Sequence, residues 1–176
     1  MHQAVADFVS QQSRLFAQGS IRVLDIGGHK VSSIYYNGPH PRDLFPQAEE
    51  YLVLDQFQGD DVDFVGDATR TWELPWMDID LVDVVVCTEV LEHVKDWVNL
   101  LVTAHEALKT GGRLILTCAG PGRPPHPATS EELSPPPGEF YANVNHMELR
   151  KALVHIGFKD VLTYQVGLDT QATAVR

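Results

Sequence analysis

The sequence predicts an α/β protein built on a doubly wound, mostly parallel β-sheet that ends in an antiparallel hairpin. Three observations lead to this prediction. Short and almost wholly apolar segments recur along the chain, as strands buried on both faces of a parallel sheet require. A segment with a helical apolar face separates two of them, as a crossover connection does. The last segments alternate apolar and polar residues, which is typical of an antiparallel pair with one solvated face.

Three helices follow from local patterns. Apolar residues at helical spacing before Gly19 predict an amphipathic helix over residues 3–18. A second apolar face predicts a helix over 97–109, which Gly111 and Gly112 would end. Asn145, followed three residues later by Glu148, resembles a capping box and predicts a helix over 146–156. The predicted strands cover residues 21–26, 51–54, 62–65, 81–87 and 114–118, with the hairpin at 161–166 and 168–175.

The length of 176 residues suits a single domain spanning 1–176, because domains typically run to roughly 100–200 residues. Cys87 and Cys118 each end an apolar run, as reduced core thiols do, and this favours a cytoplasmic setting over a disulfide scaffold. The N-terminus lacks the pattern of a signal peptide, and no apolar run approaches the roughly 18 residues that a membrane span needs. We therefore expect no membrane association.

The charge balance disfavours nucleic acid as a partner. Thirteen Lys and Arg against 24 Asp and Glu give a net charge of −11, which repels a polyphosphate, and the basic residues are scattered along the chain. A small molecule is the expected partner, and the sequence specifies no oligomeric state.

A proline-rich stretch at 119–145 cannot continue a helix or a central strand. Loops of this length in compact domains are usually functional or disordered. We interpret this segment, called the proline-rich loop below, as a lid or substrate loop.

Acidic or small residues follow successive predicted strands, at the sheet edge where doubly wound folds bind ligands. Asp25, Gly27 and Gly28 end the first strand, and glycines let a backbone approach a ligand closely. Asp55 ends the second strand, where a carboxylate can accept both hydroxyls of a ribose. Asp67 follows the third and could accept from an adenine amino group. Each alone is more often a turn or cap residue.

Taken together, these segments resemble the class I S-adenosylmethionine (SAM)-dependent methyltransferases. LDIGG at 24–28, GDA at 66–68, VLEH at 90–93 and LKTGGRLILT at 108–117 occur in that order, with Asp55 between the first two. The resemblance covers roughly residues 20–118. It implies the Rossmann-like seven-stranded methyltransferase fold, SAM as cofactor with S-adenosylhomocysteine (SAH) as product, and O- or N-methylation of a small molecule.

The resemblance also implies a set of cofactor-binding residues. It assigns Asp25, Gly27 and Gly28 to the methionine portion of SAM, Asp55 to the ribose, and Asp67 with Ala68 to the adenine, while Thr88 and Glu89 line the floor near the sulfonium; Asn37 and Gln56 are further candidates. Two features depart from the family pattern. His29 and Lys30 replace its glycine-rich continuation, and the first crossover helix shrinks to about residues 41–45.

An oxygen acceptor would benefit from a general base, for which an imidazole titrating near neutral pH is suited. His93, His126 and His146 are the candidates, each with a packing or surface role as the alternative. No cluster of carboxylates or histidines has the sequence spacing of a magnesium or zinc site, so we predict no metal centre.

Two other functions stay open. A non-catalytic SAM-binding module is motivated by the short first crossover helix and the lack of an assured base. An NAD-dependent oxidoreductase would share the glycine turn and the ribose acid, but the glycine pattern is incomplete and a second nucleotide-binding half is missing.

Overall fold

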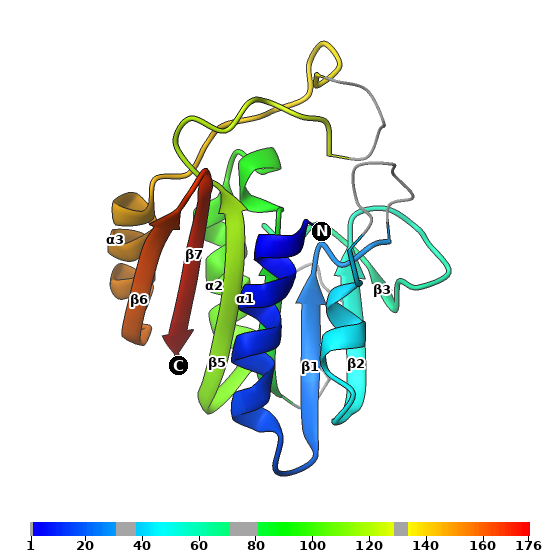
Figure 1. Cartoon of the computed structure of the whole chain (residues 1–176). Helices are drawn as coiled ribbons and strands as arrows, with labels where there is room; N and C mark the ends of the chain where they lie inside the picture. Colours follow the sequence, from blue (N-terminus) through cyan, green and yellow to red (C-terminus); the bar gives the residue numbers. More distant parts are fainter. Residues whose placement is uncertain (1, 31–37, 71–80, 129–133) are drawn as a thin grey trace.

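The computed structural model describes residues 2–30, 38–70, 81–128 and 134–176. Seven strands form one sheet in the order β3-β2-β1-β4-β5-β7-β6, with helices on both faces (Figure 1). The strands are β1 (Ile21–Ile26), β2 (Ala48–Asp55), β3 (Phe64–Val65), β4 (Val82–Thr88), β5 (Leu108–Ala119), β6 (Lys159–Val166) and β7 (Asp169–Val175). The helices are α1 (Gln3–Ser13), α2 (Trp97–Ala107) and α3 (His146–Ile156), with short 3-10 helices η1 (Arg14–Phe16), η2 (Pro41–Leu44) and η4 (Leu91–His93).

The first five strands are parallel to one another, and β7 is antiparallel to both β5 and β6. This is the predicted mostly parallel sheet with a C-terminal antiparallel hairpin, and the fold class is confirmed. The carboxyl ends of the parallel strands therefore meet at one edge. The described parts of the proline-rich loop pass over that edge (Figure 1).

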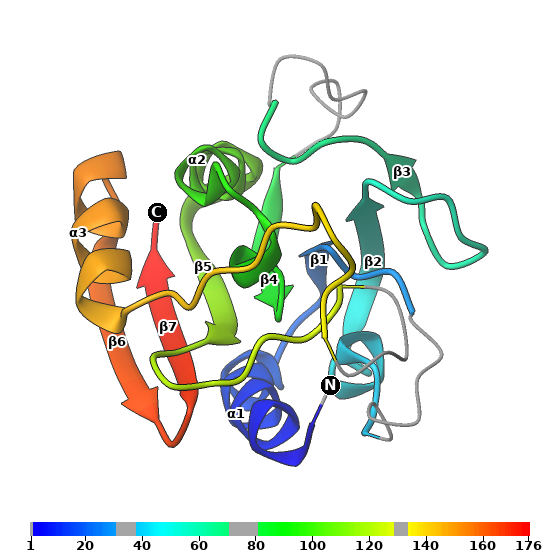
Figure 2. The same cartoon turned by 90° about the horizontal axis from the view of Figure 1, so that it is seen from above.

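Two hydrophobic layers hold the helices to the sheet. In Figure 2, α1 lies on one face, while α2 and α3 lie on the other. Strand alternation explains both layers, because Val23 of β1 points to the α1 side while its neighbours Leu24 and Ile26 point to the α2 side. Continuous apolar strands supply both layers at once. Asp25, on the same side as Val23, is the exception and is fully buried.

Several predicted boundaries shift for identifiable reasons. The helix predicted over 3–18 is α-helical only to Ser13, and its last turn is the 3-10 helix η1. β2 begins at Ala48, before its apolar run, because Glu50 pairs with Arg22 on β1, the Arg22 Nε to Glu50 Oε2 distance being 2.6 Å. β3 is only two residues long. Just before it, the Asp63 amide donates to Val53 O at 3.0 Å, but the Val53 amide donates back to the Asp63 side chain at 2.8 Å, so a side chain takes the place of one backbone acceptor there.

The helix predicted over 97–109 ends at Ala107, and the prediction that Gly111 and Gly112 stop it is wrong. Leu108 already pairs with Val82 of β4, so strand pairing overrides the helical periodicity. The glycines lie within β5, beside a register shift in its pairing with β4. A β-bulge at this point accommodates the tight turn out of the helix.

The short first crossover is confirmed as η2, and α3 has the predicted bounds. Asn145 Oδ1 accepts the Met147 amide at 2.8 Å, and Gly157 ends the helix in the left-handed conformation. Both cysteines are free and buried, as expected for core thiols.

Candidate functional site

Two adjoining hollows open at the carboxyl ends of the parallel strands. They share Gly27, His29, Glu89 and Ala128 and so form one continuous space, called the strand-end cleft below. The position at the carboxyl ends of the parallel strands is where doubly wound sheets bind ligands. One half of the cleft adjoins β2, β3 and α2, and the other adjoins η2 and the end of β4.

The glycine turn after β1 forms the centre of the cleft. Gly27 has a φ of +76°, and its amide donates to Leu54 O at 2.8 Å. A Cβ on Gly27 would lie 2.3 Å from Val90 Cγ2, and one on Gly28 would lie 2.6 Å from Asp25 Cγ. Gly27 is therefore favoured by both conformation and close packing, and Gly28 by close packing alone. The turn leaves a backbone cradle that a side chain would fill.

Asp25 lies beneath this turn and is not among the described residues that line the cleft. Its Oδ2 accepts the Tyr51 hydroxyl at 2.8 Å. Burial, only partly offset by His40 and that hydrogen bond, raises the pKa of Asp25 to about 6. In this position the side chain supports Gly28 from below.

Asp55 and Gln56 line the half of the cleft next to β2. The Asp55 carboxylate accepts two backbone amides, from His29 at 3.2 Å and from Phe57 at 2.9 Å. It therefore fixes the two loops that follow β1 and β2 relative to each other. Asp67 and Ala68 line the same half.

Asp67 and Ala68 hold the loop after β3 in place. Asp67 Oδ1 accepts the Thr69 amide at 2.9 Å and the Thr69 hydroxyl at 2.7 Å. Ala68 O accepts the Thr103 hydroxyl at 2.7 Å, which ties this loop to α2. The loop after β3, which forms one wall of the cleft, is thus held both by bonds within itself and by a bond to α2.

Thr88 ends β4, Glu89 follows it, and both line the cleft; Glu89 lines both of its halves. Glu89 has a φ of +60°, an uncommon backbone conformation for a residue with a side chain. Its amide donates to Thr117 O at 2.8 Å, which helps to hold the backbone in this conformation. Local strain of this kind concentrates at functional sites.

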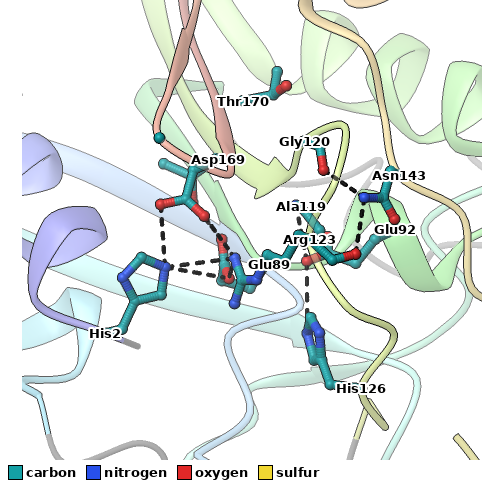
Figure 3. A network of polar contacts seen from close by, with 12 residues as sticks. His2, Glu89, Glu92, Ala119, Gly120, Arg123, His126, Asn143, Asp169 and Thr170 are labelled. Carbon is teal, nitrogen blue, oxygen red and sulfur yellow. Dashed lines mark hydrogen bonds and ion pairs between the residues drawn. The ribbon is translucent and has the colours of Figure 1, made fainter. Parts of the chain in front are cut away.

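Arg123, from the proline-rich loop, joins Glu89 to Asp169 at the start of β7 (Figure 3). Its Nη1 lies 2.5 Å from Glu89 Oε2 and 2.8 Å from Asp169 Oδ1. Asn143 Nδ2 donates to Arg123 O at 3.0 Å and also to Gly120 O. The base of the loop is thereby fastened to two strands.

A second group of polar side chains lies beside the first (Figure 3). Glu92 is fully buried, and its Oε1 accepts the Ala119 amide at 3.0 Å and lies 3.9 Å from His126 Nε2. Burial and the carboxylate of Glu89 raise the pKa of Glu92 to about 8. Burial, together with His126 and Arg123, lowers the pKa of His93 to about 4.

A family model for a methyltransferase domain matches residues 1–162. This chain belongs to the methyltransferase-domain family. The family uses SAM as its methyl donor, which confirms the cofactor predicted from the sequence. A comparison with curated proteins found no match.

Solved structures of methyltransferases share the fold at low identity. A Burkholderia thailandensis 1,6-didemethyltoxoflavin-N1-methyltransferase, crystallised with bound 1,6-didemethyltoxoflavin and SAH, is 18% identical with a TM-score of 0.63. The match covers 98% of this chain and 78% of that one. A DhpI–SAH complex is 17% identical, with a TM-score of 0.64 and coverages of 97% and 84%. A SAM-dependent methyltransferase from Archaeoglobus fulgidus is 15% identical, with a TM-score of 0.62 and coverages of 97% and 94%.

The methyltransferase fold brings most of the predicted cofactor residues together. The described residues lining the cleft include Gly27, Gly28, Asp55, Gln56, Asp67, Ala68, Thr88 and Glu89. Asn37 lies outside the described residues. Of the three histidine candidates, His93 lines the cleft, His126 packs behind it with ring centroids 5.0 Å apart, and His146 begins α3 away from the cleft lining.

Sequence reasoning missed several residues that shape this site. His40 caps η2, accepting the Arg42 amide at 3.2 Å, and its Nε2 lies 2.7 Å from Gly28 O. Asp61 accepts the Lys30 amide at 2.7 Å. His40 and Asp61 therefore hold the backbone on either side of His29 in place. The local signal for the role of His40 was its place directly before Pro41, where the first crossover helix was expected to start.

Across the described ranges 2–30, 38–70, 81–128 and 134–176, no helix has the length and apolar character of a membrane span.

Proposed function

We propose that this chain binds SAM in the strand-end cleft and transfers its methyl group to a small-molecule acceptor. The observation that carries the proposal is the convergence of Asp55, Asp67 and Glu89 on one cleft around the glycine turn. These carboxylates come from the ends of three different strands. A packing role for each would not require that they share a space.

The shape of the cleft supports a specific placement of the cofactor. The backbone cradle at Gly27 and Gly28, which a Cβ would fill, suits the methionine portion, with Thr88 close by. Asp55 and Gln56 are positioned for the ribose hydroxyls. Beyond them, the loop at Asp67 and Ala68, backed by apolar side chains, suits the flat adenine ring.

When bound, SAM supplies an electrophilic methyl group on sulfur. The chain's own contribution is to hold the acceptor in line with that group and to exclude water, since near-attack positioning accounts for much of the rate of such transfers. Ala128 of the proline-rich loop lines both halves of the cleft. Its amide donates to Glu139 Oε1 at 2.6 Å, which links the two legs of the loop. We therefore propose this loop as the lid and acceptor wall.

The acceptor is proposed to be a small molecule. The B. thailandensis structure holds a bound small molecule in a protein of the same fold, and the charge of −11 on this chain does not suit nucleic acid. Among the three histidine candidates, His93 is best placed for a general base. Its lowered pKa makes it a neutral but weak base at pH 7, so positioning carries more of the catalysis than proton transfer.

Titration calorimetry with SAM, SAH and NAD tests the proposal. We expect both adenosyl ligands to bind and NAD not to bind. Asp55→Ala should weaken SAH binding by about 1–3 kcal/mol, or roughly 5–150-fold, because it removes a ribose acceptor and releases the His29 and Phe57 amides. Asp60→Ala, an exposed acid on the same loop, is the matched control for the change in charge and should leave the affinity unchanged.

Each other outcome points to one of the alternatives. NAD binding without SAH binding would favour the oxidoreductase. Tight SAH binding with no methylation of any acceptor in a broad small-molecule screen would favour the non-catalytic module.

Gly27→Ala should lower SAH affinity as well as the stability of the protein. Left-handed backbone costs about 1–2 kcal/mol for a residue with a Cβ, and the new methyl group would collide with Val90. We expect that loss in urea denaturation, together with a fall in SAH affinity measured by calorimetry. Gly167→Ala has the same left-handed strain with nothing within 4 Å of the added Cβ, so it should lose stability and keep its affinity. Equal SAH affinity in both variants would rule out this role for Gly27.

A further inference from the structure

Three potential metal ligands come together beside the strand-end cleft. Glu92 and His93 lie in η4, and His126 comes from the proline-rich loop. One carboxylate oxygen and one nitrogen from each ring all lie within 4.8 Å of one another. A single ion placed among the three atoms could contact them all after only small shifts, since metal–ligand bonds are about 2.0–2.2 Å long.

The three side chains present unused polar atoms to this space. Within the described part of the chain, Glu92 Oε2, His93 Nδ1 and His126 Nε2 are buried and make no hydrogen bond. Buried polar atoms are nearly always paired, and each exception calls for an explanation such as a missing ion or water. Three such atoms in one group, one of them on a fully buried carboxylate, point to a ligand shared by all three.

His126 is held in the orientation of a metal ligand. Its Nδ1 lies 3.4 Å from Pro124 O. Because a carbonyl oxygen can only accept, Nδ1 must carry the hydrogen in this contact, and in the neutral ring the lone pair is then on Nε2, which faces Glu92. Metal-bound histidines commonly donate their other ring N–H to a backbone carbonyl in this way. The rings of His93 and Tyr141 pack against His126 at 5.0 and 5.1 Å between centroids and fix its plane.

A neighbouring group with similar ligands, His2, Glu89 and Asp169, serves as a comparison. There the guanidinium of Arg123 already lies between the two carboxylates, at 2.5 and 2.8 Å. That group has its cation. Among the described contacts Arg123 makes no ion pair of that length with Glu92, so its charge acts on the Glu92 carboxylate only from a longer distance.

We propose that Glu92, His93 and His126 form a binding site for a divalent first-row transition-metal ion. Two imidazoles and one carboxylate suit ions such as Zn²⁺, Co²⁺, Mn²⁺ or Fe²⁺, whereas Mg²⁺ prefers a shell of oxygen ligands. Three protein ligands leave open positions on the metal, and these would face the cleft that His93 lines. With a metal bound, His93 would be a ligand, and the metal would take over from it the activation of the acceptor.

The site also explains why sequence spacing predicted no metal centre. Glu92 and His93 are adjacent, but His126 follows far along the chain, and only the return of the proline-rich loop over the sheet edge brings it back. The site adjoins the proposed donor cleft, so an acceptor oxygen bound to the metal would lie near the methyl group and lose its proton more easily. That consequence rests on the proposed function, whereas metal binding does not.

Cobalt binding tests the proposal. The tag-free full chain, stripped with chelator and desalted, would be titrated with Co²⁺ while visible absorption is recorded. We expect one equivalent to bind with a d–d spectrum, Zn²⁺ to displace it, and equimolar Mg²⁺ to leave it in place. His126→Ala should weaken Co²⁺ binding by at least roughly 10–100-fold, since even the loss of a residue that only supports a metal ligand costs that much. His155→Ala, which changes an exposed histidine outside the site, should leave Co²⁺ affinity unchanged.

Glu92→Gln, which keeps the shape of the side chain, provides a second variant should His126→Ala fail to fold, and circular dichroism checks both. No stoichiometric Co²⁺ binding, equal affinity in His126→Ala and His155→Ala, or displacement by equimolar Mg²⁺ would each overturn the proposal. An SAH titration on the same samples separates the two proposals. SAH binding without Co²⁺ binding removes the metal site and keeps the methyl-donor cleft, and the reverse result removes only the cleft.

Discussion

Arg123→Met should lower the free energy of unfolding by about 3–5 kcal/mol, the range for removing one partner of a buried ion pair. Glu89 and Asp169 are more than nine-tenths buried, and the guanidinium is the cation between them (Figure 3). Methionine keeps the volume and leaves two carboxylates facing each other without a counter-charge. In a chain of 176 residues this loss corresponds to a fall of roughly 6–20 °C in melting temperature.

Urea and thermal denaturation measure the loss, with Arg14→Met as the control, because Arg14 is an exposed arginine at the end of the first helix. Substitutions of exposed residues usually change stability by no more than about 0.5 kcal/mol. Neutralising both acids in the same chain, as Glu89→Gln and Asp169→Asn, should recover part of the stability of Arg123→Met. If Arg123→Met behaves like Arg14→Met, the network does not hold the base of the loop.

Most of the fold could be predicted because its signals are local. The bounds of β1 and α3 were predicted correctly because each signal lies in a short local window. One signal is an apolar run ended by a glycine turn, and the other is an N-cap followed by a glycine stop. The boundaries that moved depend on pairing with another strand. Leu108 leaves the helical pattern because it pairs with Val82, a partner that no local window contains.

The cofactor side of the site could be predicted for a related reason. In a parallel sheet, residues that directly follow strands meet at one edge, so Asp55 and Asp67 needed only their strands to be recognised. Arg123 and His126 lie in a loop without regular structure, and nothing in its sequence says which side chains return to the cleft. Asp25 lies in a different position from Asp55 and Asp67. It ends a strand as the others do, but strand alternation turns it toward the α1 side and beneath the turn.

This placement of Asp25 makes the stability of the protein depend on pH. Its pKa in the folded state is about 6, against 3.8 for an ordinary aspartate, because burial disfavours the charged form. The stability that the protonated side chain contributes is therefore fully present below about pH 4 and is lost as the pH rises through 6. A shift of this size corresponds to about 3 kcal/mol.

Asp25→Asn should abolish this dependence, because the amide stays neutral and its oxygen can still accept from Tyr51. We expect the difference in unfolding free energy, wild type minus Asp25→Asn, to fall by about 2 kcal/mol between pH 4 and pH 7 in urea titrations, since part of the full effect is already lost at pH 4. Asp160→Asn, at an exposed position whose left-handed backbone asparagine tolerates, should give a flat difference. If the difference in unfolding free energy for Asp25→Asn is also independent of pH, the Asp25 carboxyl is solvated and the glycine turn above it is open to water.

The same titration in saturating SAH links this carboxyl to the proposed function. The α-ammonium of a ligand seated on the glycine turn would lie above Asp25, whose Oδ1 is buried and makes no hydrogen bond to any described residue. A positive charge there favours the ionised carboxylate and lowers its pKa. SAH should then reduce the loss of stability between pH 4 and pH 7 in the wild type and have no such effect in Asp25→Asn. An unchanged pH dependence in the wild type would place the ligand's ammonium away from this turn.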